Sequence, residues 1–153
     1  DRVKGLPPGP VRAMTVSSNG HLWLATQSGL GRMDAAHARF DVEPGIDHEC
    51  EVLAAVGDEI VAGGSQGIAC GRPGQLHTLA GFAGVQDIVV SDNGLAWIAC
   101  SSGIAVLRPP IANAHPEVVV PPSGAVGRIA SGVGTGWASS GQDLLEKIGR
   151  AHV

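Results

Sequence analysis

The stretch GHLWLATQSGLGRMD, Gly20 to Asp34, decides the fold because the same order of residues returns as GLAWIACSSGIAVLR, Gly94 to Arg108. Each copy has a turn glycine, a tryptophan three positions later, small residues, a second glycine and a short apolar run that ends in a charged residue. The interval between Trp23 and Trp97 is about twice the length of such a unit. We therefore expect another copy between them.

A common register places further copies between and after these two stretches. The tryptophan position reads Trp23, Val61, Trp97 and Trp137, and the glycine six residues later reads Gly29, Gly67, Gly103 and finally Asp143. A unit of roughly 35–40 residues with four short strands is typical of a β-propeller blade. The sequence therefore predicts an all-β fold, a β-propeller fragment with about three complete four-stranded blades and most of a fourth. A β-sandwich of irregular hairpins is the alternative.

Within a unit, the residue types follow the strand order of an antiparallel meander. The opening strands, VRAMTVS from residue 11 and VQDIVVS from residue 85, are rich in β-branched and apolar residues. Asn19-Gly20 and Asn93-Gly94 stand at the following hairpin tips, where we expect both central residues to adopt positive φ. The tryptophans stand among small residues in the second strand, so we expect them to fill the layer between adjacent sheets.

The repeats also divide the chain. We expect residues 1–146 to form the propeller repeats, with blades at approximately 11–45, 49–81, 85–121 and 125–146. The final residues 147–153, KIGRAHV, resemble the translation of a short-read sequencing adapter. We expect a non-native tail there and base no functional argument on it.

Composition narrows the classes of function. The chain has 153 residues, a formal net charge of −4 and 44% hydrophobic residues, which favours a globular domain over a nucleic-acid or anionic-membrane surface. No apolar run approaches the ~18 residues of a membrane-spanning helix, and we expect no signal peptide within this segment. Cys50, Cys70 and Cys100 form no Cys-x-x-Cys pair, so we expect small buried side chains there rather than metal or redox chemistry.

Residues 5–34, GLPPGPVRAMTVSSNGHLWLATQSGLGRMD, resemble the repeat of the two-component regulator propeller family. The matching positions are Leu6, Pro7, Val11, Gly20, Leu22, Trp23, Thr26, Gly29, Leu30 and Arg32. The third unit is similar to the repeat at Val85, Asn93, Gly94, Trp97, Ile98, Gly103 and Ile104. The second unit departs from it at Glu49 and Val61, and the fourth departs at Asp143.

The resemblance implies a ligand-sensing propeller of a bacterial two-component-type signalling protein, in the periplasm. A membrane helix would link it to a histidine kinase or diguanylate cyclase output. The partners implied are an unknown small ligand and the missing blades and output domain of the same protein, without nucleic acid and without membrane contact from this segment. The matched residues are structural, so the resemblance leaves the ligand open.

Ligands of propellers usually meet the face built from the turns between second and third strands and from the connections between blades. On that face Gln27, Gln66 and Ser101 are polar residues of hairpin turns. They could bind a small polar ligand such as a saccharide, although hairpin turns favour these residue types in any case.

The stretch DHECE, residues 47–51, adds Asp47, His48 and Glu49 to these candidate ligand-binding residues. In an extended strand Glu49 would share one face with Glu51, and His48 would share the other with Cys50. No second cluster completes a metal shell, so the sequence favours a solvated loop for this stretch. We therefore expect no metal, no cofactor and no catalytic residue.

Two other classes of function remain open. Some propellers are lyases or hydrolases of the virginiamycin-lyase kind, which would require an acid–base pair on facing axial loops. An interaction scaffold of the WD40 kind is the other, although the Trp-Asp strand ending and the Gly-His opening are absent. The sequence favours a sensor or recognition module that is not an enzyme.

Overall fold

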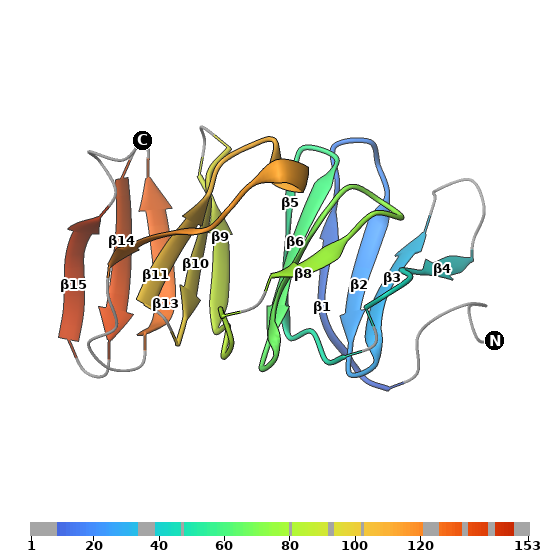
Figure 1. The fold of residues 1–153 in the computed structure, drawn as a ribbon, viewed down its shortest axis with the longest axis horizontal. Helices are drawn as coiled ribbons and strands as arrows, with labels where there is room; N and C mark the ends of the chain where they lie inside the picture. Colours follow the sequence, from blue (N-terminus) through green and yellow to red (C-terminus); the bar gives the residue numbers. More distant parts are fainter. Residues whose placement is uncertain are drawn as a thin grey trace.

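The computed structural model describes residues 9–33, 39–46, 48–79, 81–91, 94–101, 103–120, 126–132, 135–140 and 143–148, with side chains up to residue 118. In these residues the strands form sheets that stand side by side (Figure 1). Three sheets have four strands and one has three, each in an antiparallel arrangement. The all-β prediction is confirmed, with three complete four-stranded units and most of a fourth.

Within each sheet the strands follow the order of the chain. The first sheet contains β1 (Val11–Val16), β2 (Leu22–Thr26), β3 (Gly29–Met33) and β4 (Phe40–Val42). The second contains β5 (Val52–Val56), β6 (Glu59–Gly64), β7 (Gly67–Gly71) and β8 (His77–Leu79). The third contains β9 (Asp87–Val90), β10 (Ala96–Cys100), β11 (Gly103–Leu107) and β12 (Glu117–Val120). The fourth contains β13 (Val126–Gly132), β14 (Thr135–Ser140) and β15 (Asp143–Ile148).

The first strands of consecutive sheets contact one another, β1 with β5, β5 with β9 and β9 with β13. The last strands β4, β8 and β12 pair only with the third strand of their own sheet. Radial sheets that meet along their first strands are the architecture of a β-propeller. The first strands therefore line the inner edge.

The first hairpin tip differs from the expected turn. The Ser17 amide donates to the His21 carbonyl at 3.0 Å, and the Gly20 amide donates to the Ser17 carbonyl at 2.9 Å. These bonds close a three-residue loop in which Gly20, with φ of 85°, takes the left-handed position. The bond from the Gly20 amide to the Ser17 carbonyl places the two residues before Gly20 at the centre of the turn. The Asn-Gly pair therefore stands at the hairpin tip as expected, but the expected two-residue turn with two positive φ angles is wrong.

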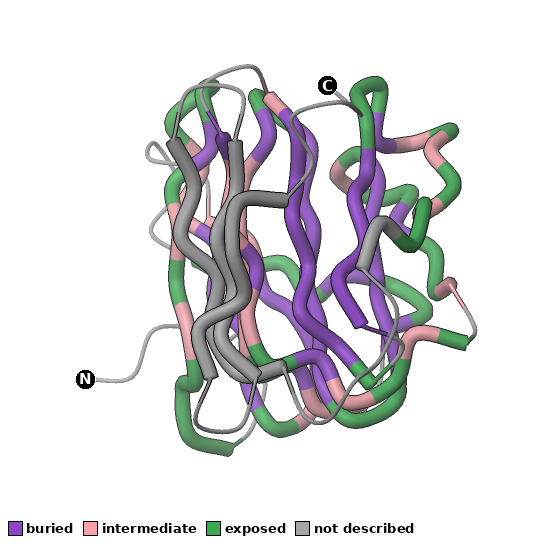
Figure 2. Tube along the Cα trace, turned by 90° about the vertical axis from the view of Figure 1, so that its left-hand side faces the viewer, coloured by how far each residue is buried: buried purple, intermediate pink, exposed green. Residues whose placement is uncertain are grey.

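Buried apolar side chains fill the layers between sheets, and the trace in Figure 2 is buried along the middle of the described strands. One cluster lies between the first and second sheets and another between the second and third. Trp23 is 0% exposed and belongs to the first of these clusters, which confirms that it fills an interface between sheets. Trp97 is also buried, at 1% exposure. The side chain of Trp137 lies outside the described residues. Together the layers make each sheet dependent on its neighbours.

Two buried glutamates join neighbouring sheets. The Glu43 carboxylate accepts the Gly74 amide, with its oxygens at 2.9 and 3.1 Å from that nitrogen. The Glu59 carboxylate accepts the amides of Ile111 and Ala112 at 2.9 and 2.7 Å. Ile111 begins η1 (Ile111–Asn113), a short 3-10 helix between β11 and β12 that the sequence pattern did not predict. Each carboxylate thus binds the main chain of the following sheet.

Candidate functional site

The turns between second and third strands lie at the same end of the molecule as the connections between sheets, the lower end in Figure 1. We call this end the turn face. Among described residues it comprises 27–28, 43–46, 48–51, 65–66, 81–86 and 101. The antiparallel order explains it, because the second strand and the fourth strand both run toward this end.

Main-chain hydrogen bonds fix each connection on the turn face. The Cys50 amide donates to the Thr26 carbonyl at 3.2 Å, at the end of the second strand of the first sheet. The Val85 amide donates in the same way to the Gly64 carbonyl at 3.0 Å. The residue after Cys50 then bonds to the second sheet, because the Glu51 amide donates to the Gly63 carbonyl at 2.8 Å. Main-chain hydrogen bonds therefore join both of these connections to the sheet before and the sheet after.

Close packing beneath these connections requires glycine. A Cβ added to Gly63 would lie 2.5 Å from Cγ1 of Val85. Val85 is itself 1% exposed, so it has no free space to move into. Gly63 therefore sets how closely the connection approaches the second sheet.

The three predicted turn residues are at the surface of the turn face. Gln27, Gln66 and Ser101 are all exposed and occupy the turns of consecutive sheets. The Ser101 hydroxyl donates to the Ala83 carbonyl at 2.6 Å, and its amide donates to the same oxygen at 3.0 Å. Ser101 is therefore anchored to the connection before the third sheet, whereas the two glutamines extend from their turns.

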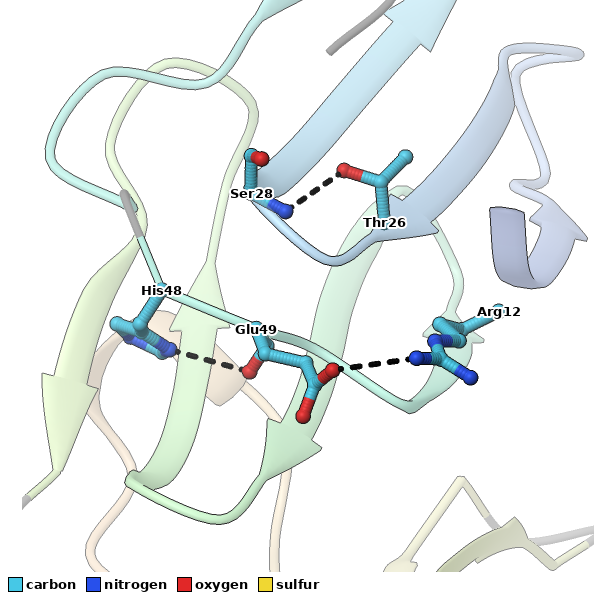
Figure 3. Close-up of polar contacts among 5 residues, drawn as sticks. All are labelled: Arg12, Thr26, Ser28, His48 and Glu49. Carbon is cyan, nitrogen blue, oxygen red and sulfur yellow. Dashed lines mark hydrogen bonds and ion pairs between the residues drawn. The ribbon is translucent and has the colours of Figure 1, made fainter. Parts of the chain in front are cut away.

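His48 and Glu49 lie together with Arg12, as Figure 3 shows. A guanidinium nitrogen of Arg12 lies 3.5 Å from a carboxylate oxygen of Glu49, and these side chains are 44% and 28% exposed. His48 Nδ1 lies 3.3 Å from the Glu49 carbonyl oxygen, and a hydrogen bond between them requires the tautomer with its proton on Nδ1. Predicted Asp47 lies outside the described residues. The structure thus brings two of the three predicted residues of this stretch together and adds a cation.

Residues 48–51 form a connection and no strand, so the alternation that an extended strand would give does not apply there. Cys50 is 0% exposed within the layer between the first two sheets, while Glu51 is exposed. Burial, aided by the charge of Glu49, raises the pKa of the Cys50 thiol to about 11. Cys50 is therefore a protonated packing residue at neutral pH, and within the described residues no group of three or more histidine, cysteine or acidic side chains is placed to hold a metal.

Arg12 is a member of the site that sequence reasoning missed. In each of the first three sheets, one residue of the first strand pairs with the penultimate residue of the second strand. The residue just before it is exposed in all three sheets and is Arg12, Glu51 or Gln86. They therefore occupy equivalent positions at the inner edge of the turn face. Aligning VRAMTVS with CEVLAAV and VQDIVVS puts them in one column, which is the signal that could have found them.

On the turn face, then, Thr26 and Ser28 close the first turn, with the Ser28 amide donating to Thr26 Oγ1 at 3.2 Å (Figure 3). Around this turn the polar side chains of Gln27, Arg12 and Glu49 are at least partly accessible. This arrangement offers hydrogen-bond donors and acceptors and one ion pair. Its chemistry is that of polar recognition.

The comparisons with known proteins agree with the fold. The model of the two component regulator propeller matches residues 5–28, which confirms the resemblance for the first repeat. No curated protein matches the sequence. The described residues include no helix with the length and apolar character needed to span a bilayer.

Solved structures resemble the chain over nearly its whole length. The extracellular domain of BT4673 from B. thetaiotaomicron, assigned as a hybrid two component system, has a TM-score of 0.72 at 14% identity and covers 97% of this chain. That of BT3049 from the same organism has a TM-score of 0.59 at 16% identity and covers 90%. This chain spans only 22% and 20% of those two chains. The computationally designed Ika4 protein has a TM-score of 0.71 at 14% identity, with 95% of this chain and 93% of that chain covered.

Proposed function

We propose that the chain is the ligand-recognition part of a sensor β-propeller in a bacterial two-component-type signalling protein, and that it binds without catalysis. The match of the two component regulator propeller to residues 5–28 carries this proposal. The similarity to extracellular domains of proteins assigned as hybrid two component systems supports it at the level of the fold. The proposal places the chain in the periplasm, with a histidine kinase or diguanylate cyclase as the output.

We propose the turn face as the binding surface and a small polar molecule, such as a saccharide, as the ligand. Exposed Gln27 and Gln66 supply amide donors and acceptors, and Arg12 adds a cation. Trp23 and Trp97 are buried, so their rings are unavailable for stacking on a sugar. A ligand on the turn face would therefore be bound by hydrogen bonds from the exposed polar side chains and not by aromatic stacking.

The test is a titration of the ¹⁵N-labelled chain with a panel of small polar molecules that includes mono- and disaccharides. We expect amide shifts to change at Gln27, Gln66 and Ser101 and to stay constant at the opposite end, around Gly20. Gln66→Ala should weaken binding by about three- to tenfold, the worth of one lost hydrogen bond. Gln75→Ala is the matched control, because Gln75 is exposed in the connection between β7 and β8.

Two results would contradict this proposal. Binding that Gln66→Ala and Gln75→Ala weaken equally would show that the ligand is not held on the turn face. Recovery of a chemically altered ligand after incubation would favour a lyase or hydrolase, so the ligand should be recovered and weighed by mass spectrometry after each titration. An unchanged mass together with a selective loss in Gln66→Ala supports recognition without catalysis.

A further inference from the structure

The two described interfaces between sheets differ in where they place their large residues. Trp23 of the first sheet shares a buried cluster with Ala62 and Ala69, which are cross-strand partners on the second sheet. All three are 0% exposed. In this interface a large side chain on one sheet is matched by small ones on the next.

The second interface reverses these sizes. The turns pair Thr26 with Gly29, Gly64 with Gly67 and Cys100 with Gly103, which fixes the equivalent positions. By this register Val61 takes the place of Trp23, and Ile98 takes the place of Ala62. Val61 and Ile98 lie in one buried cluster at 0% exposure.

The neighbouring position, Gly71 of β7 and Leu107 of β11, is set by the backbone and not by tryptophan. Gly71 has φ of 139°, and a Cβ there would lie 3.0 Å from the Gln75 carbonyl oxygen. Its cross-strand partner Ile60 supplies the large side chain of that pair, as Leu107 does beside Ala96. The size difference between the two interfaces therefore lies at Ala62 and Ile98. Because layers between sheets are packed to near-crystalline density, a gain of volume on one side requires a loss on the other.

The first sheet has another face, which is turned away from the second sheet. At the position equivalent to Ala62 and Ile98 this face carries a large residue. Leu24 is equivalent to Ala62 and Ile98, and Met33 is equivalent to Gly71 and Leu107. Leu24 is 7% exposed at the middle of this face.

The same face carries exposed apolar side chains at its edges. Met14 and Val16 of β1 pair with Leu24 and Leu22, and they are 68% and 62% exposed. Val42 of β4 pairs with Gly31 and is 52% exposed. An apolar edge of this kind is typical of an interaction surface.

We propose that size matching at this position selects which sheet packs against which, and that the outward face of the first sheet fits a sheet of this repeat with a small aliphatic residue in place of tryptophan. Its partner is therefore a sheet like the second one, with Val61, rather than one like the first or third. The proposal concerns assembly of the fold and does not depend on the function proposed for the turn face.

The experiment adds residues 43–79 ahead of the full chain in two forms, one with Val61 and one with Val61→Trp in the added copy. The readout is oxidation of Met14 by hydrogen peroxide, followed by mass spectrometry. We expect the copy with Val61 to abolish rapid oxidation of Met14 and the Val61→Trp copy to leave it. In a chain that also carries Leu24→Ala, the copy with Val61→Trp should become the protective one. Equal protection by both copies, or protection by neither, would overturn the proposal for this face.

The rule itself is tested inside the unextended chain at the first interface. Ala62→Ile alone should lower the thermal midpoint, because Trp23 leaves no room for the added carbons. In the Trp23→Val background the same Ala62→Ile change should raise the midpoint by filling the space that tryptophan vacated. An Ala62→Ile effect of the same sign in both backgrounds would show that sizes are not matched across the interface.

Discussion

Replacing Glu59 with alanine should destabilise the protein more than any surface substitution on the second sheet. The Glu59 side chain is 7% exposed and accepts the amides of Ile111 and Ala112 at 2.9 and 2.7 Å. Ile111 is 0% exposed, so water cannot replace the lost acceptor there without moving η1. A buried donor left without an acceptor costs about 1–3 kcal/mol, and the second donor, Ala112, is only partly buried, so the expected loss for Glu59→Ala is about 2–4 kcal/mol.

The assay is equilibrium unfolding in urea with an unchanged m-value. For m of about 2 kcal/mol/M the expected loss lowers the midpoint by about 1–2 M. Glu59→Gln keeps one acceptor oxygen and should lose less, and Asp58→Ala, at the exposed neighbouring position, should change stability by no more than about 0.5 kcal/mol. Hydrogen exchange at the amides of Ile111 and Ala112 should accelerate in Glu59→Ala. If Glu59→Ala and Asp58→Ala shift the midpoint equally, the carboxylate does not hold η1 and the reasoning fails.

Other predictions rest on single positions. Burial raises the pKa of Glu43 above its ordinary value of 4.5. The contribution of this group to stability is therefore fully present below pH 4.5 and is lost as the pH rises through the raised pKa. When unfolding is measured across pH, the free energy of unfolding of wild type should rise relative to that of Glu43→Gln on acidification. Gly63→Ala should lower the thermal midpoint because its Cβ would meet Val85, whereas a neutral result would mean that the connection can move. Burial, aided by the charges of Glu49 and Glu59 respectively, raises the pKa of Cys50 and Cys70 to about 11, so both should react with a thiol reagent at pH 8 only after denaturation, and rapid labelling of the native protein would contradict that placement.

The features that the sequence predicted are those that a local pattern encodes. Strand and turn positions repeat along the chain, so aligning the Trp23 and Trp97 stretches was enough to find the sheets and the turn face. The strands β2 and β10 indeed bury these tryptophans. The type of hairpin tip was missed because the Asn-Gly pair is compatible with both two-residue and three-residue loops, and only the register of the flanking strands distinguishes them.

The features that the sequence did not predict depend on contacts between distant segments. Glu43 and Gly74 are 31 residues apart, and Glu59 and Ile111 are 52 residues apart. Neither glutamate has an equivalent glutamate in the other sheets, since Glu43 follows β4 and Glu59 begins β6. An alignment of repeats therefore treats each as an ordinary polar residue. The ion pair of Arg12 with the connection before β5 was missed for the same reason.

The separation between scaffold and surface explains why the candidate site is harder to read than the fold. Main-chain bonds, such as the Cys50 amide to the Thr26 carbonyl and the Val85 amide to the Gly64 carbonyl, hold the connections without using their exposed side chains. The exposed turn side chains of Gln27 and Gln66 then carry little of the folding energy, and a change there leaves the sheets intact. If the turn face binds a ligand as proposed, such positions can vary with that ligand without changing the repeat. A fold specified by its repeat and a candidate binding face not specified by it are therefore expected in the same chain.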